Sequence, residues 1–163
     1  MMKFDRQRLI FGLYALVLIT IAELLMGYFK LPSWPAFVAW ILFFIEQMSI
    51  KKTSYILVGA VSGIGLLLLA PLVIGLLTPL IGAQWGTLAY ILLAVYAIVA
   101  FGEMVPHILN NYAFLYLTIG AVAIQQPNPN PILWILIASV GGGLLIAGTM
   151  LIGKIMGVSA PAR

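Results

Sequence analysis

The sequence predicts an all-α integral membrane protein with six transmembrane helices. Of its 163 residues, 64% are hydrophobic and only 7% are charged, whereas a soluble domain is roughly half apolar and a quarter charged. Apolar runs long enough to cross a bilayer recur along the whole chain. The basic residues lie between these runs, where positive charge sets membrane orientation. Because no composition shift marks a second domain, residues 1–163 are predicted to form one transmembrane domain.

The first apolar run, 9–29, follows a basic start that resembles a signal peptide. It continues for about 20 residues without an A-x-A cleavage site, so it is predicted to be retained as a first span. Glu23 lies in this run. An acid within a membrane span often lines a substrate path, but a neutral Glu23 close to Lys30 is an equally good interpretation.

The second and third runs cover 34–50 and 55–77. Glu46 lies near the inner end of the second run, where pairing with the nearby lysines explains it as well as a place on a path does. Two residues of the third run have structural roles in this prediction. Gly59 belongs to a small-residue face for close helix packing, and Pro71 is expected to kink the helix.

Residues 84–124 are too long for one span, since a single helix would measure roughly 60 Å. Pro106 is the predicted break, because proline removes a backbone donor and disfavours helix in the residue before it. The break carries polar side chains. We expect Glu103, His107, Asn110 and Asn111 to lie in a cytoplasmic turn and the first turns of the fifth span, as candidates for a substrate path or as turn and capping residues.

The last run, 132–152, is rich in glycine. Close packing against another helix explains these glycines better than ligand contact does. The predicted helix-packing glycines of the third and sixth spans are Gly59, Gly63, Gly141, Gly142, Gly143 and Gly148.

Charge orients the six spans. With both termini in the cytoplasm, only one of the eight lysines and arginines, Lys30, faces outward. A five-span chain would move Lys154 and Arg163 to the outside and fits the positive-inside rule less well. Six spans also bring Trp34, Trp85 and Trp134 close to the outer interface, where tryptophan is enriched.

Two segments of the chain resemble each other. "YILVGAVSGIGLLLL" from Tyr55 is similar to "WILIASVGGGLLIAG" from Trp134, and "LPSWPAFVAW" from Leu31 is similar to "VPHILNNYAFLYL" from Val105. The possible repeats are 9–80 and 84–154. Since each contains three spans, the second would be inverted relative to the first, as in many transporters.

The spacing of "LPSWPAF", "FGEMVP" and the glycine-rich last span resembles the YcdZ-like family of small bacterial inner-membrane proteins. That family is functionally uncharacterised, so the resemblance implies only a location in the bacterial inner membrane. The chain departs from the family pattern around His107 and Asn110, and no site is carried over.

The predicted function is a small-solute channel or transporter for a cation, a proton-coupled solute or a small neutral polar molecule. The alternative is a non-transporting membrane subunit or assembly partner of a larger complex. Besides the lipid bilayer, the expected partner is a second copy of the chain, since one small bundle has little room for a central cavity. No nucleophile–base pair, phosphate loop or metal-ligand set indicates an enzyme. We expect no cofactor, metal or nucleic acid.

Overall fold

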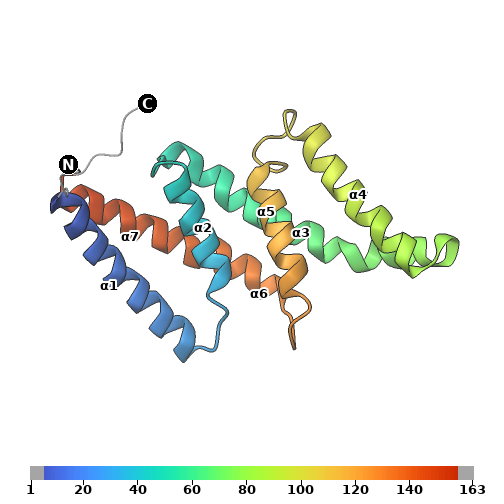
Figure 1. The fold of residues 1–163 in the computed structure, drawn as a ribbon, viewed down its shortest axis with the longest axis horizontal. Helices are drawn as coiled ribbons and strands as arrows, with labels where there is room; N and C mark the ends of the chain where they lie inside the picture. Colours follow the sequence, from blue (N-terminus) through green and yellow to red (C-terminus); the bar gives the residue numbers. More distant parts are fainter. Residues whose placement is uncertain (1–5, 158–163) are drawn as a thin grey trace, which may run out of the picture. The chain divides into compact units, whose positions relative to one another are not determined.

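The computed structural model describes residues 6–157, and within this range every regular element is a helix. The all-α prediction is therefore confirmed. In chain order the elements are α1 (Arg6–Tyr28), α2 (Trp34–Ile45), α3 (Ile50–Ile81), α4 (Ala83–Phe101), α5 (Asn111–Ala123), α6 (Pro131–Leu136), the π-helical turn η1 (Ile137–Gly141) and α7 (Gly142–Ile155) (Figure 1). The last three form one continuous helical stretch.

Four of these segments are long and apolar enough to cross a membrane, judged by length and composition: α1, α3, α4 and the stretch from α6 to α7. The other two apolar helices are shorter. α2 has 12 residues and α5 has 13, which correspond to about 18 and 20 Å at 1.5 Å per residue. Both lengths fall short of the hydrocarbon thickness of about 30 Å.

The shortness of α2 has a local cause. The sequence predicts a second span that continues to Ile50, but α2 ends at Ile45 because Gln47 and Met48 have φ angles of 54° and 60°. This left-handed conformation is costly for residues with a Cβ and cannot continue a right-handed helix. A tight turn therefore leads directly into α3.

Pro106 acts differently from the sequence prediction, whereas Pro71 lies inside a helix as expected. α4 ends at Phe101, so Pro106 lies in the middle of a loop, 102–110, and does not itself end a helix. Pro71 and Pro79 both lie inside α3, which continues to Ile81. The turn between α3 and α4 is made instead by Gly82, whose φ of 83° is accessible to glycine without a steric penalty.

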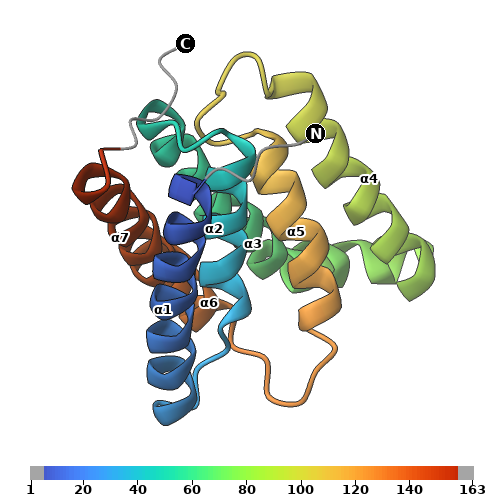
Figure 2. The same cartoon turned by 60° about the vertical axis from the view of Figure 1, so that its left-hand side comes forward.

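The chain divides into two compact units. The first contains the residues up to Thr53 and those from Ile137 onward, and the second contains Ser54–Leu136. In the first unit, α1 and α2 both contact α7, and α2 also contacts η1 (Figure 2). Its core includes Phe43 and Ile146, which are almost fully buried.

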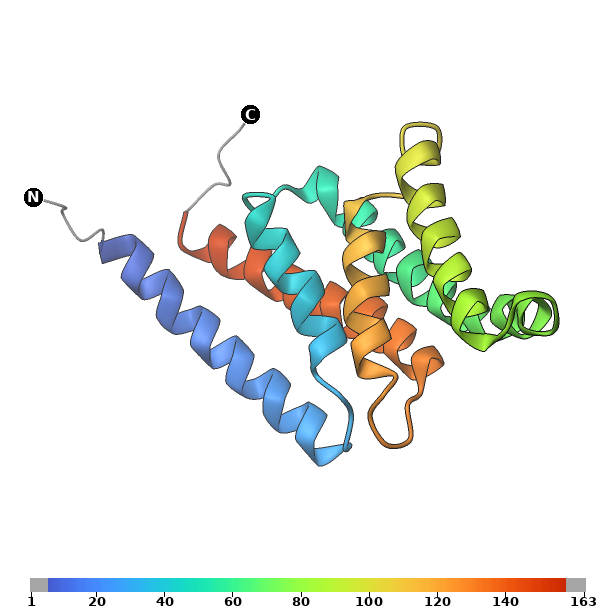
Figure 3. The ribbon, with the colours of Figure 1, turned by 45° about the vertical axis from the view of Figure 1, so that its right-hand side comes forward.

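In the second unit, α4 and α5 are joined by the loop 102–110 and contact each other (Figure 3). α5 also packs against α3. Ile56, Ile64 and Tyr116 are completely buried.

Candidate functional site

The polar start of α5 is organised by Asn110. Its Oδ1 atom accepts hydrogen bonds from the backbone N–H groups of Tyr112 and Ala113, at 3.0 and 2.9 Å. This is N-cap geometry, in which a side-chain oxygen satisfies donors that the helix cannot. Asn110 therefore ends the loop and begins the helix, one residue before α5.

The Nδ2 atom of Asn110 faces three backbone carbonyls. It donates to Pro106 at 2.9 Å, to His107 at 3.3 Å and to Tyr55 of α3 at 3.3 Å. Both the amino group and the carbonyl oxygen of the side-chain amide therefore take part in hydrogen bonds within the protein. We conclude that Asn110 positions the loop and α5, and that its hydrogen-bonding capacity is already taken by the protein itself.

Two further contacts hold the loop against α3. Ser62 Oγ donates to the carbonyl of Ile108 at 2.6 Å, and the rings of His107 and Tyr55 stack with their centroids 3.8 Å apart. The loop 102–110 is consequently fastened at both His107 and Ile108. We call the group Tyr55, Ser62, His107 and Asn110 the α5-entry cluster.

The predicted path residues are divided between the two compact units. Glu103, His107 and Asn111 are exposed at or next to the entry of α5 in the second unit, whereas Glu23 and Glu46 belong to the first unit. Within that unit, Phe11 contacts Phe44 next to Glu46. Glu23 lies 12 residues beyond Phe11 on α1, a rise of about 18 Å. Glu23 and Glu46 therefore lie toward opposite ends of the first unit.

The glycines of α3 allow α5 to approach closely. A Cβ atom built on Gly59 would lie 2.6 Å from Oδ1 of Asn110 and 2.9 Å from the Cβ of Tyr112. On Gly63 it would overlap the carbonyl oxygen of Ala113 and lie 2.8 Å from the Cβ of Tyr116. Only hydrogen fits at these two positions.

The glycines of the last helical stretch contact α1 and α2 in the first unit. A Cβ on Gly142 would lie 2.6 Å from the Cβ of Ala39 and 3.5 Å from the carbonyl oxygen of Ala36. Gly141 lies against Ala36 as well, and Gly148 faces the side chain of Leu18 at 3.0 Å. Gly143 is half-buried.

The two glycine contacts share one geometry. In each unit a glycine meets the carbonyl of the third residue after the N-cap of a short helix, and the Cβ of the residue one turn later. These residues are Ala36 and Ala39 in α2, and Ala113 and Tyr116 in α5. Gly63 and Gly142 also correspond in the two similar segments of the sequence. α2 and α5 therefore pack on α7 and α3 in the same register.

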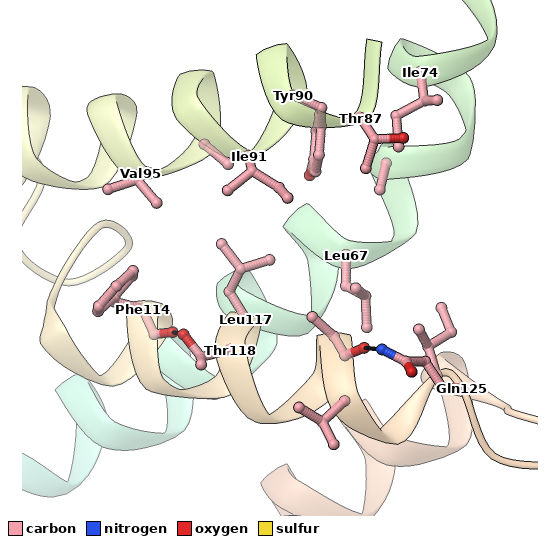
Figure 4. A pocket seen from close by; sticks show the side chains of 15 residues that line it. Leu67, Ile74, Thr87, Tyr90, Ile91, Val95, Phe114, Leu117, Thr118 and Gln125 are labelled. Carbon is pink, nitrogen blue, oxygen red and sulfur yellow. Dashed lines mark hydrogen bonds between the residues drawn. The ribbon is translucent and has the colours of Figure 1, made fainter. Parts of the chain in front are cut away.

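Sequence reasoning missed two features. One is a buried hydrogen bond of 2.6 Å from Trp40 Nε1 of α2 to Thr149 Oγ1 of α7. A threonine within an apolar glycine-rich run is the signal that could have indicated it. The other is a cavity of about 590 Å³ in the second unit, between α3, α4 and α5 (Figure 4). No short motif marks a cavity of this kind.

Comparison with known proteins adds no relative. No family model, no curated protein and no solved structure matches the chain. The resemblance to the YcdZ-like family therefore stays a prediction. Within residues 6–157 no group of three or more histidine, aspartate or glutamate side chains is arranged to hold a metal ion.

Proposed function

We propose that this protein is a small-solute channel or transporter of the bacterial inner membrane, with six membrane passes in two inverted halves and both termini in the cytoplasm. One observation carries the proposal: α2 and α5, the second helices of the two halves, are both unusually short and pack on glycines in the same register. A pair of short helices in corresponding positions of two repeats is the best indication of a transport site that a chain of this kind offers.

The short length of α5 affects how deep in the membrane the adjoining backbone would lie. α5 covers about 20 Å of a hydrocarbon layer of about 30 Å. Part of the adjoining non-helical backbone must then lie below the membrane surface, where it is tolerated only if protein or water covers it. The side chains of the α5-entry cluster would cover this backbone. The exposed His107 and Asn111 are the groups that a solute in a water-filled vestibule would meet.

The charges favour a neutral solute among the three classes that the sequence predicts. None of the acidic side chains within residues 6–157 is buried: Glu23 and Glu103 are exposed, and Glu46 is half-buried. A cation path normally presents carboxylates or carbonyls to the ion. We therefore propose a small neutral polar molecule as the substrate.

The flux of neutral solutes tests the function directly. Proteoliposomes of the full-length protein are expected to admit glycerol or urea faster than empty liposomes and to remain tight to K⁺. His107→Ala and Asn111→Ala should each change the rate severalfold, while Gln126→Ala, in the exposed loop 124–130, should not. Permeability equal to that of empty liposomes for every solute would overturn the proposal.

Topology is tested separately with single-cysteine variants, since the chain contains no cysteine. We expect Gln7→Cys and Lys154→Cys to react with impermeant thiol reagents from the cytoplasmic side, and Lys30→Cys and Gln126→Cys from the opposite side. Labelling of Gln7→Cys and Lys154→Cys from different sides would exclude an even number of passes.

The second candidate is a non-transporting membrane subunit, and α1 is the observation that favours it. None of the residues Arg6–Tyr28 is buried. Leu13, Leu16 and Leu24 are more than half exposed, so the helix offers a long apolar surface to another transmembrane helix. Stable co-purification of a second polypeptide in a fixed ratio, without any solute flux, would favour this function.

A further inference from the structure

The cavity of the second unit is lined by side chains of α3, α4 and α5 (Figure 4). Its volume of about 590 Å³ is in the range of small-molecule sites, roughly 300–1,000 Å³. Buried side chains form its inner wall: Leu67 from α3, Tyr90 and Ala94 from α4, and Leu117 from α5. None of the residues that line it is charged.

The cavity is polar at one end and apolar at the other. Thr87 of α4 and Gln125, two residues after the end of α5, lie at the same end of the cavity, because α4 and α5 run in opposite directions (Figure 4). Val95 and Phe114 line the other end together with Thr118, whose hydroxyl donates to the carbonyl of Phe114 at 2.9 Å (Figure 4). Such a polarity gradient matches a molecule with a small polar head and one apolar chain.

The hydrogen bonds at the polar end of the cavity indicate which chemical groups the head of such a molecule would need. The Thr87 hydroxyl donates to the carbonyl of Ala83 at 2.9 Å, and Gln125 Nε2 donates to the carbonyl of Ala121 at 3.3 Å. The hydroxyl of Tyr90 likewise donates to the carbonyl of Leu66. Backbone carbonyls engage the two hydroxyl protons and one of the two N–H groups of Gln125, while the Thr87 hydroxyl oxygen, Gln125 Oε1 and the second Gln125 N–H remain available. A head that both donates and accepts hydrogen bonds without carrying a charge, such as an alcohol, fits this end.

We propose that this cavity binds an uncharged, single-chain lipid whose head carries hydroxyl groups. The chain lies along Ile91, Val95 and Phe114, and the head hydroxyls donate to Gln125 and Thr87. A charged head is disfavoured because none of the lining residues supplies a countercharge. The inference rests on the cavity alone and does not depend on the proposed transport of a polar solute.

Native mass spectrometry of the purified full-length protein tests the proposal, with 1-monooleoylglycerol as the probe. Oleate and lysophosphatidylcholine serve as charged-head controls with similar chains. We expect one monooleoylglycerol per protein, bound about tenfold more tightly than either control.

Two variants locate the bound lipid. Ala121→Phe projects a ring into the cavity and should weaken binding about tenfold, whereas Ala100→Phe, on an exposed position of α4 outside the cavity, should not change it. Gln125→Leu removes an acceptor without filling the space, so it should abolish the preference for the alcohol head and leave oleate binding unchanged. This variant keeps the proposal testable if Ala121→Phe lowers the folded yield.

Three results would overturn the proposal. Equal binding of the three lipids to wild type and Ala121→Phe would indicate nonspecific lipid around the protein. If no lipid-bound protein is detected at a saturating concentration of monooleoylglycerol, the cavity does not bind this class of lipid. A shift from dimer to monomer in Ala121→Phe, with no effect of lipid, would assign the cavity to a second copy of the chain.

Discussion

Asn110 combines two structural roles in a single side chain. Its oxygen caps α5, and its nitrogen holds the loop 102–110 and the carbonyl of Tyr55. The polar residue types in this segment are visible in the sequence, but which of the two adjacent asparagines is the cap depends on where the helix begins. The structure assigns that position to Asn110 and leaves Asn111 exposed as the first residue of α5.

Removal of the cap should destabilise the second unit. Asn110→Ala is expected to lower the free energy of unfolding by about 1–2 kcal/mol, the usual cost of losing an N-cap. Asn110→Ser keeps an oxygen for the helix but loses the contacts to the loop carbonyls, so its stability should be intermediate. Thermal unfolding in detergent measures this order, with Asn111→Ala as the neutral control. Equal melting temperatures for both alanine variants would contradict the assigned cap.

Two glycines of α3 offer a matched comparison. Gly63→Ala places a methyl group against the Ala113 backbone and should cost about 1–3 kcal/mol as an overpacked contact. Gly65→Ala meets no atom within 4 Å, and alanine favours the helix by about 0.5–1 kcal/mol. The free energy of unfolding should therefore be lower than that of wild type for Gly63→Ala and higher for Gly65→Ala. A similar loss of stability in both would mean that the contact with α5 is unimportant.

At the scale of elements, the sequence predicts the positions of the helices better than their ends. Each of the six apolar runs corresponds to a helical segment, because long apolar stretches leave the backbone no partner in lipid other than itself. The ends depend on local conformations that composition does not reveal. Gln47 and Met48 end the α2 region through positive φ angles, and α4 stops four residues before Val105.

The contact between α2 and α7 depends on one buried hydrogen bond in addition to the glycines. Trp40 Nε1 donates to Thr149 Oγ1, which itself donates to the carbonyl of Leu145 at 2.9 Å. Thr149→Val removes the acceptor and leaves the indole N–H buried without a partner, at a cost of about 1–3 kcal/mol.

A double-mutant cycle isolates this bond. Trp40→Phe in the Thr149→Val background should cost less than Trp40→Phe in wild type, because the indole has no acceptor left to lose. The measurement is the unfolding midpoint of the four proteins. Strict additivity of the two substitutions would mean that the hydrogen bond contributes nothing to stability.

At the scale of the whole molecule, each compact unit combines segments that are distant in the sequence. α7 packs with α1 and α2 in the first unit, and α3 packs with α5 in the second. The similar segments of the sequence predict an internal repeat, but they do not reveal that α3 packs with α5 or that α7 packs with α2. Such pairing is determined by contacts between distant residues, which one sequence does not display.

A divided chain tests this pairing. Fragments 1–82 and 83–163 should be unstable when expressed separately, because each lacks the partner of its short helix, and should form a folded complex when expressed together. A division at Gln126 serves as the control, since it leaves α3, α4 and α5 on one fragment. That fragment should retain a cooperative unfolding transition by itself. Stable folding of fragment 1–82 alone would contradict the prediction.

The pairing of α2 with α7 also has a consequence for biosynthesis. About 100 residues separate the two helices, so at 5–20 residues per second the ribosome needs roughly 5–20 s to deliver α7 after it has made α2. During that interval the alanine face of α2 is without its glycine partner. Completion of the first unit must therefore await the synthesis of α7, and a nascent chain stalled before Gly141 would present an unfinished surface to quality-control proteases.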